Sequence, residues 1–360
     1  MIIDRYLLRE IVKPFLVIWA VLTILITSYG AARFLSDAVN GLLPMGMLVR
    51  LVGFRTLISF DVLIPISLYL AVVIALGRMQ ADCEFTAMVA LGVTPARVAG
   101  VVAILSTGIA LGVGGLSLFL RPWAYERSHE LSDRAAASLN VRNMQAGAFY
   151  VDRGENRTIF IGRRDAPGAP GRDVFVQLRL ADGTRVIEAR SVEQTSSAPG
   201  ASGSLIHLIG AHVYDIHSRG AAGDLVMNVN DLTLRLPKPQ VRPPEYSSVA
   251  ASTAHLTRSD SPADRSELEW RLSTAVTTLL LGILGVQLSR SRPREQKNVR
   301  LGMAILIYAA YYLAYESVRT WVQSSRIPTF PGLWWVPAGL ATCMLAAAFA
   351  ARHLSWRRPA

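Results

Sequence analysis

The sequence predicts an α+β membrane protein in which six transmembrane helices enclose one inserted extracytoplasmic β-domain. Long apolar runs are concentrated in residues 1–120 and 270–356, whereas the stretch between them has the composition of an ordinary soluble domain. The chain is 51% hydrophobic with a mean hydropathy of +0.33, which is high for a soluble protein with 18% charged residues. Short β-rich runs separated by turn residues fill the middle region and indicate the inserted domain.

Six apolar runs approach the roughly 20 residues that a membrane-crossing helix needs. The second is interrupted only by Asp61, and the fifth reaches full length by continuing through Glu316 and Arg319 to about Val322. We expect the sixth helix to begin after Pro331. The first run has basic residues before it, as a signal peptide would, but its apolar core is too long for one and predicts an uncleaved helix. The runs are residues 14–32, 56–77, 98–120, 272–289, 301–315 and 327–351.

The basic residues predict the orientation of these helices. With the amino terminus inside, 13 Lys and Arg residues fall in inside segments and 5 in short outside segments, which favours cytoplasmic termini. Residues 1–120 then hold the first three helices with a cytoplasmic helix at about 79–92, residues 121–265 form the periplasmic β-domain and its linker, and residues 266–360 hold the last three helices. The basic residues behind the net charge of +11 are almost all arginine, and much of that arginine lies beside apolar runs, which argues against nucleic-acid binding.

The middle region predicts at least six antiparallel strands. These would form a sandwich, a jelly roll or an open barrel. A Pro- and Ser-rich linker over 237–262 follows, and a capping box at Ser266–Glu269 begins the helix that leads into the fourth span. The predicted strands are Ala148–Asp152, Thr158–Arg163, Val174–Leu180, Arg185–Ala189, Leu205–Tyr214 and Leu225–Leu236.

Catalytic motifs are absent from the sequence. It contains no P-loop, G-x-S-x-G, H-E-x-x-H or C-x-x-C pattern. His207, His212 and His217 recur every five residues, and strict strand alternation would place successive ones on opposite faces, so we expect no metal site. Cys83 and Cys343 are far apart, and the β-domain has no cysteine. We therefore expect neither a catalytic activity nor a cofactor of the chain's own.

The inside loop after the second span predicts a short helix of about three turns. Gly92 suits a helix end, and Thr94-Pro95 suit the start of the third span. Phe85, Met88, Val89 and Leu91 would form an apolar stripe with Glu84 at its front. The helix either lies in the headgroup layer or inserts into a groove of a cytosolic partner, in which case the docking residues are Glu84, Phe85, Met88 and Leu91.

Charged residues within or next to a span often have a function. Arg33 lies at the outer end of the first span, where it either snorkels to the interface or binds a lipid phosphate through its guanidinium. Glu316 and Arg319 are three residues apart and can pair along the fifth helix. The candidate lipid-contacting residues are Leu22, Ile26, Tyr29 and Arg33 of the first span and Ile305, Tyr308, Tyr312, Glu316 and Arg319 of the fifth.

The order and spacing of several segments resemble a known family. They are residues 1–7 (MIIDRYL), 63–68 (LIPISL), 76–78 (LGR) leading into Glu84 and Leu91-Gly92, and 267–272 (ELEWRL) after the β-domain. The whole chain resembles the LptF/LptG permeases of the lipopolysaccharide export ABC transporter, and residues 1–7 and 267–272 favour the LptF side of that family.

This resemblance implies a structure and a set of partners. The β-domain would be a periplasmic jelly roll whose strands continue into LptC-like and LptA-like proteins. An LptG-like permease would complete a cavity for lipopolysaccharide, and an LptB-like ATPase dimer, which binds the ATP, would dock where the family's loop glutamate matches Glu84. Arg33 matches a basic residue that faces the substrate's phosphates, although few other basic residues surround it here.

Three other functions stay open at this point. The chain could be the paralogous LptG-type subunit, or an ABC membrane subunit of the same architecture that transmits force without carrying lipid. A membrane-anchored enzyme or sensor would need a cluster of acid and base residues or a metal site outside the membrane, and the sequence offers neither.

Overall fold

The computed structural model describes residues 2–39, 45–137, 146–147, 149–152, 157–166, 169–180, 183–195, 204–217, 224–236, 246–289 and 297–356. Predictions about the arginines at 290–294, the prolines at 237–244 and the turns at 154–156 and 220–223 lie outside these residues. The chain divides into two compact units. A helical unit comprises Met1–Gly30, Gly53–Ser128 and Tyr246–Ala360, and a second unit comprises Ala31–Val52 and His129–Glu245.

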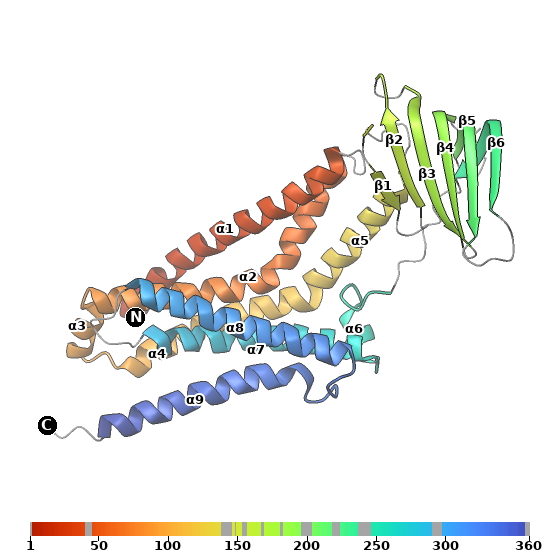
Figure 1. Ribbon diagram of the computed structural model, residues 1–360. Coiled ribbons are helices and arrows are strands. Elements are labelled where there is room, and N and C mark those ends of the chain that lie inside the picture. Colours follow the sequence, from red (N-terminus) through yellow and green to blue (C-terminus); the bar gives the residue numbers. More distant parts are fainter. Residues whose placement is uncertain are drawn as a thin grey trace. The chain divides into compact units, whose positions relative to one another are not determined.

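Within the described residues, six helices are long and apolar enough to cross a membrane, as predicted. The described part of the fifth extends to Gln323, in agreement with the prediction that it continues past Glu316 and Arg319. The third continues through a π-helical segment, η1 (Leu116–Leu120), into α5 without a break at residue 120. The helices are α1 (Ile2–Val39), α2 (Met45–Ala81), α3 (Glu84–Ala90), α4 (Pro95–Gly115), α5 (Arg121–Ala137), α6 (Thr253–Leu256), α7 (Pro262–Ser289), α8 (Lys297–Gln323), the 3₁₀ turn η3 (Gly332–Trp334) and α9 (Trp335–Trp356) (Figure 1).

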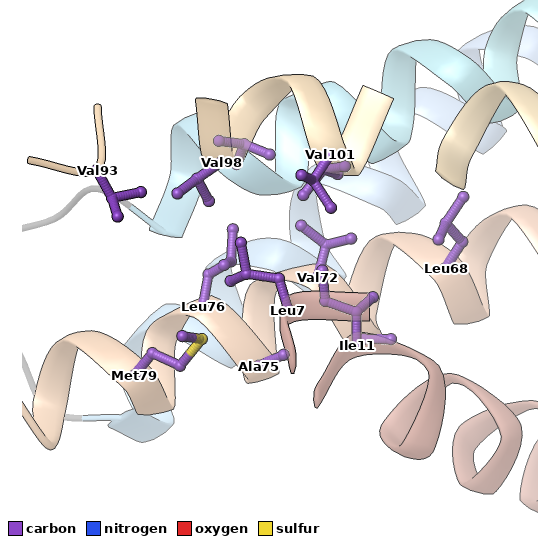
Figure 2. Packing of buried hydrophobic residues seen from close by; sticks show 13 residues of the cluster. Leu7, Ile11, Leu68, Val72, Ala75, Leu76, Met79, Val93, Val98 and Val101 are labelled. Atoms are coloured by element: carbon purple, nitrogen blue, oxygen red, sulfur yellow. The ribbon is translucent and has the colours of Figure 1, made fainter. Parts of the chain in front are cut away.

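One apolar core joins the first turns of α1 to α2 and α4. Leu7 and Ile11 are fully buried in it, and Figure 2 shows them beside Val72 and Leu76 of α2. Burying one such side chain contributes about 1.5–3 kcal/mol. The amino end of α1 is therefore part of the packed core, although little of the rest of this span is buried within the chain.

The second unit contains a sheet of six strands in the order β1-β2-β3-β4-β5-β6, with every neighbouring pair antiparallel. All six predicted strands are present. Strands that are consecutive in the sequence are neighbours in the sheet, so the described strands form an up-and-down meander. The strands are β1 (Phe149–Asp152), β2 (Arg157–Arg163), β3 (Gly171–Leu180), β4 (Gly183–Thr195), β5 (Ser204–His217) and β6 (Leu225–Leu236) (Figure 1).

A transverse crease crosses this sheet. The ladder pairs skip one row, made of Gly162, Asp173, Arg190, Gly210 and Asn230, although the register on both sides of the row is the same. Asp173 has φ 55° and Gly210 has φ 64°. Such positive φ values rotate the chain out of regular strand geometry and favour glycine. Each strand therefore changes the side on which its alternate residues lie when it crosses the crease.

The crease overturns the prediction that His207 and His212 lie on opposite faces of the sheet. The buried residues of β5 are Ile206 and Leu208 before Gly210 and Ala211 and Val213 after it, an interval of three residues where alternation requires two. His207 and His212 consequently lie on the same face of the sheet, where His207 Nδ1 pairs with Thr233 and His212 Nδ1 with Asn228. Among the described residues no group of His, Cys, Asp and Glu side chains is arranged to hold a metal ion.

Candidate functional site

The short helix α3 follows α2 at one end of the helical unit. Residues 79–92 do not form one helix, because α2 continues to Ala81 and Cys83, with φ 57°, separates it from α3. At the other end of α3, Gly92 N–H donates to Val89 O (2.9 Å) and Val93 N–H to Met88 O (3.0 Å). With Gly92 at φ 87°, this is the Schellman arrangement that closes a helix. Thr94 then caps α4, as predicted.

The four predicted docking residues fall into two groups. Phe85 and Met88 are half-buried and pack on the core that contains Leu7 and Ile11. Leu91 is 82% exposed, and Glu84 is exposed and accepts a hydrogen bond from Tyr6 Oη (2.9 Å). One side of α3 therefore holds it on its own chain, and Glu84 and Leu91 remain accessible to another molecule.

A cluster of buried charges lies where η1, α5, α7 and α8 meet. Glu267 of α7 is fully buried and accepts hydrogen bonds from three guanidinium groups. Arg121 and Arg271 (Nε, 3.1 Å) donate to its Oε1, and Arg319 Nη2 donates to its Oε2 at 2.9 Å. We call Asp61, Arg121, Glu267, Arg271 and Arg319 the Glu267 cluster.

Asp61 and Trp270 extend the cluster to α2. Trp270 Nε1 donates to Asp61 Oδ2 (2.7 Å), and Arg121 Nε lies 3.5 Å from the same oxygen. The guanidinium of Arg319 lies 4.5 Å from the Trp270 ring centroid and that of Arg121 lies 5.6 Å from it. Buried charges are tolerated only when they are paired and hydrogen-bonded. These contacts pair the buried charges of four helices, α2, α5, α7 and α8, with one another.

Arg271 also fixes the segment that precedes α7. Its Nη1 donates to Thr253 Oγ1 (3.1 Å) and its Nη2 to Val249 O (3.1 Å). Tyr246, at the start of this segment, donates to Asp264 Oδ1 at 2.7 Å, and burial together with this bond raises the pKa of Tyr246 to about 12. The chain that returns from the sheet to the helices is thus held by the cluster.

Tyrosines line the contact between α7 and α8. Tyr311 Oη and Thr277 Oγ1 are 2.7 Å apart, and Tyr315 Oη pairs with Ser273. Tyr308 stacks on Tyr312 with ring centroids 6.2 Å apart. The hydroxyls hold α8 to α7 through exchangeable hydrogen bonds, where interdigitated apolar side chains would be the ordinary contact. Together with residues of α2, the four tyrosines and Thr277 line a pocket of about 30 Å³, large enough for a water molecule.

The predicted lipid-contacting residues are only partly brought together. Tyr308 and Tyr312 line the pocket, and Glu316 pairs with Tyr312 (3.2 Å) and, at 3.7 Å, with Arg319. The pocket lining includes no residue of α1. Arg33 and Ile305 are exposed on their helices, as are Ile26 and Tyr29, whereas Leu22 is half-buried.

Sequence reasoning missed the centre of this site. Asp61 stood out only as an interruption of the second span, and Arg121, Glu267 and Arg271 were not assigned a role. Two signals could have found them. Charges inside membrane helices seek partners, and Glu267 and Arg271 have the i, i+4 spacing of a helical ion pair.

Comparisons with known proteins agree with this architecture. The family model described as lipopolysaccharide export system permease LptF/LptG matches residues 5–350. The lipopolysaccharide export system permease protein LptF of Escherichia coli (strain K12) is 24% identical over 340 residues, covering 93% of this chain and 90% of the relative. LptF of Shigella flexneri matches with the same identity and coverage.

Proposed function

Because the chain belongs to the LptF/LptG family of lipopolysaccharide export permeases, we propose that it is the LptF-type half of the transporter and that its two polar ends have separate tasks. Members of this family are membrane subunits of the export system and carry no catalytic domain. In our proposal α3 receives the movement of a cytosolic ATPase dimer. The packed helices α7 and α8 transmit this movement to lipopolysaccharide beside α8.

The observation that carries this proposal is that one side of α3 packs on its own chain and the other side is exposed. Phe85 and Met88 attach the helix to the core of α1, α2 and α4, while Glu84 and Leu91 face outward. A helix held on one side and offering a carboxylate and a leucine on the other can transmit a push from a partner into the membrane helices. The partner groove that fits it is apolar with a basic rim.

The docking role is tested with Glu84→Ala in the assembled transporter. We expect the variant permease to insert normally and to retain much less of the ATPase on co-purification, because a charge-assisted contact is lost. Thr86→Ala, an exposed change on the same helix, is the matched control. If Glu84→Ala shows the same co-purification and export as the unchanged protein, Glu84 is not part of the docking surface.

Lipid contact is tested with photo-crosslinking side chains at Arg33 and Tyr312. Both should capture lipopolysaccharide in the working transporter, while a crosslinker at the exposed Leu345 of α9 serves as the control for bulk lipid. If neither position captures lipopolysaccharide while ATP turnover persists, the chain transmits force without carrying lipid, which is the alternative function.

The orientation in this proposal places both termini and α3 in the cytoplasm and the sheet in the periplasm, as the arginine distribution indicates. Cys83 is exposed beside α3 and provides a probe. In a Cys343→Ser background, a membrane-impermeant maleimide should label Cys83 only after the inner membrane is opened. Labelling in intact spheroplasts would show that the chain has the opposite orientation.

Family membership supports a proposal for the remaining partners. We propose an LptG-like permease as the second half of the membrane pair, an LptC-like single-span protein beside α8, and an LptA-like protein that continues the sheet outward. The exposed apolar residues at the sheet's two outer strands support such an extension, since Phe149 of β1 is 66% exposed and Leu225 of β6 is 49% exposed.

A further inference from the structure

The first three turns of α1 carry polar side chains that each pair with a different element. Asp4 binds Arg97 of α4 through two hydrogen bonds, Oδ1 to Nε at 3.0 Å and Oδ2 to Nη2 at 2.9 Å. Glu10 pairs with Arg78 near the end of α2. Between them, Tyr6 donates to Glu84, the first residue of α3. The amino end of α1 thus contacts all three elements that surround the proposed docking surface.

Apolar contacts make this end of α1 a firm base. Leu7 and Ile11, which follow Tyr6 along the helix, are fully buried in the core on which Phe85 and Met88 of α3 also pack. The Tyr6 hydroxyl is therefore carried by a backbone that cannot shift without disturbing the core.

Helix α3 itself is weakly held. It has seven residues, none of them buried, and an isolated helix of that length is not stable. No side chain caps its amino end, because Cys83 occupies the cap position in a left-handed conformation without a side-chain hydrogen bond. Besides the backbone hydrogen bonds that close it, the described side-chain contacts that hold α3 include two half-buried side chains, Phe85 and Met88, and the bond between Glu84 and Tyr6.

The bond also sets how Glu84 is presented. Tyr6 occupies Oε2, and the structure shows no hydrogen bond to Oε1 among the described residues. The side chain is thus fixed in one direction with one carboxylate oxygen available to a donor. An exposed glutamate without such a contact would lose more side-chain entropy on docking.

We propose that Tyr6 is the positioning residue of the docking helix: its hydroxyl orients Glu84 toward a guanidinium or ammonium group of the ATPase. This inference rests on the proposed function and assigns a part of it to α1, which lies outside the docking helix. Through Leu7 and Ile11, the orientation of Glu84 is linked directly to the first membrane span.

The test measures the dissociation constant between the ATPase dimer and the assembled permease pair in lipid nanodiscs, with Tyr6→Phe, Glu84→Ala and both changes combined. Loss of one hydrogen bond and its orienting effect should weaken binding about 3- to 10-fold in Tyr6→Phe. The double variant should bind as weakly as Glu84→Ala alone, because Tyr6 acts only through Glu84.

Two controls separate this role from a general loss of structure. Tyr246→Phe removes another tyrosine–carboxylate bond, to Asp264, at a site remote along the chain from α3, and should leave the dissociation constant unchanged. Asp4→Asn weakens the neighbouring contact of α1 with Arg97 and should also leave it unchanged.

Each outcome decides a separate question. If Glu84→Ala does not weaken binding, the docking function itself is overturned, and the role of Tyr6 with it. If Glu84→Ala weakens binding but Tyr6→Phe does not, the Tyr6 inference alone is overturned. The same holds if the double variant binds more weakly than Glu84→Ala. An effect of Asp4→Asn equal to that of Tyr6→Phe would likewise overturn it, since the whole end of α1 would then be responsible.

Discussion

The helical unit holds its charges in opposite ways at its two ends. In the Glu267 cluster the side chains of Asp61, Arg121 and Glu267 are at most 4% exposed. Beside α3, the side chains of Arg78 and Arg97 are 55% and 50% exposed. The same types of ion pair therefore operate in a dry interior at one end and at a wet surface at the other.

The difference matters because burial changes what an ion pair contributes. A buried charge that loses its partner destabilises a protein by about 3–5 kcal/mol, whereas an exposed pair contributes about 0–1 kcal/mol. We infer that the Glu267 cluster fixes which helices lie together, and that the pairs beside α3 orient side chains without dominating stability. The exposed end can then rearrange when a partner binds.

Glu267→Ala should have the largest effect of any single change at either end. It leaves three guanidinium groups without their shared acceptor, so we expect a loss of about 3–5 kcal/mol. Thermal unfolding in detergent, followed by tryptophan fluorescence, measures it. Glu126→Ala, at an exposed glutamate of the same unit, is the control. A change below about 1 kcal/mol for Glu267→Ala would show that the cluster does not organise the helices.

Arg319→Lys should have an intermediate effect. The ammonium group keeps the charge for Glu267 but loses the planar stacking on Trp270, where the guanidinium now lies 4.5 Å from the ring centroid. We expect a loss of about 1–2 kcal/mol in the same unfolding experiment. Arg97→Lys at the exposed end should destabilise the protein much less, because that pair is exposed to solvent. Equal effects of the two substitutions would contradict the comparison between the ends.

The two ends also differ in how far the sequence predicted them. Gly92 and Thr94 are local signals, and their predicted roles at the end of α3 and the start of α4 are confirmed. The six spans and six strands follow from hydropathy and alternation in the same way. In the Glu267 cluster, Asp61 accepts a hydrogen bond from Trp270, which is 209 positions away, and no local pattern indicates which charges meet. Tyr6 likewise carries no signal for a partner 78 residues away.

The crease in the sheet marks another limit of prediction. Alternation predicts faces correctly only while each strand keeps regular geometry. The positive φ of Gly210 and Asp173 reverses, within the strand, which face the alternate residues occupy. Glycine and aspartate are too common in sequences for either residue to indicate such a reversal. In β6 the apolar residues do shift from odd to even positions between Val229 and Leu232, a trace of the crease that becomes interpretable once the strands are aligned.

The pair between Arg185 and Asp215 offers a case of intermediate exposure, with side chains 39% and 13% exposed. Its hydrogen bonds lower the pKa of Asp215, so the pair's contribution is present above the unfolded-state pKa and is lost as pH falls through the folded-state value. Asp215→Asn should reduce the stability of the sheet by about 0.2–1 kcal/mol near pH 7. The difference from the unchanged protein, measured by hydrogen exchange, should shrink toward pH 3 and below. A difference that grows on acidification would contradict the assigned pairing.

Asp4→Asn should have the smallest effect, because the pair of Asp4 with Arg97 is half-exposed and each charge can be hydrated when the other is absent. We expect only a small decrease in the thermal unfolding temperature of the assembled permease at low salt. At about 1 M salt the Debye length falls to about 3 Å, so the difference should nearly vanish. Glu267→Ala should remain destabilising under the same conditions, since salt does not reach the Glu267 cluster. If Asp4→Asn were as insensitive to salt as Glu267→Ala, the amino end of α1 would be as dry as the cluster, and α3 would have no hydrated surface on which to exchange partners.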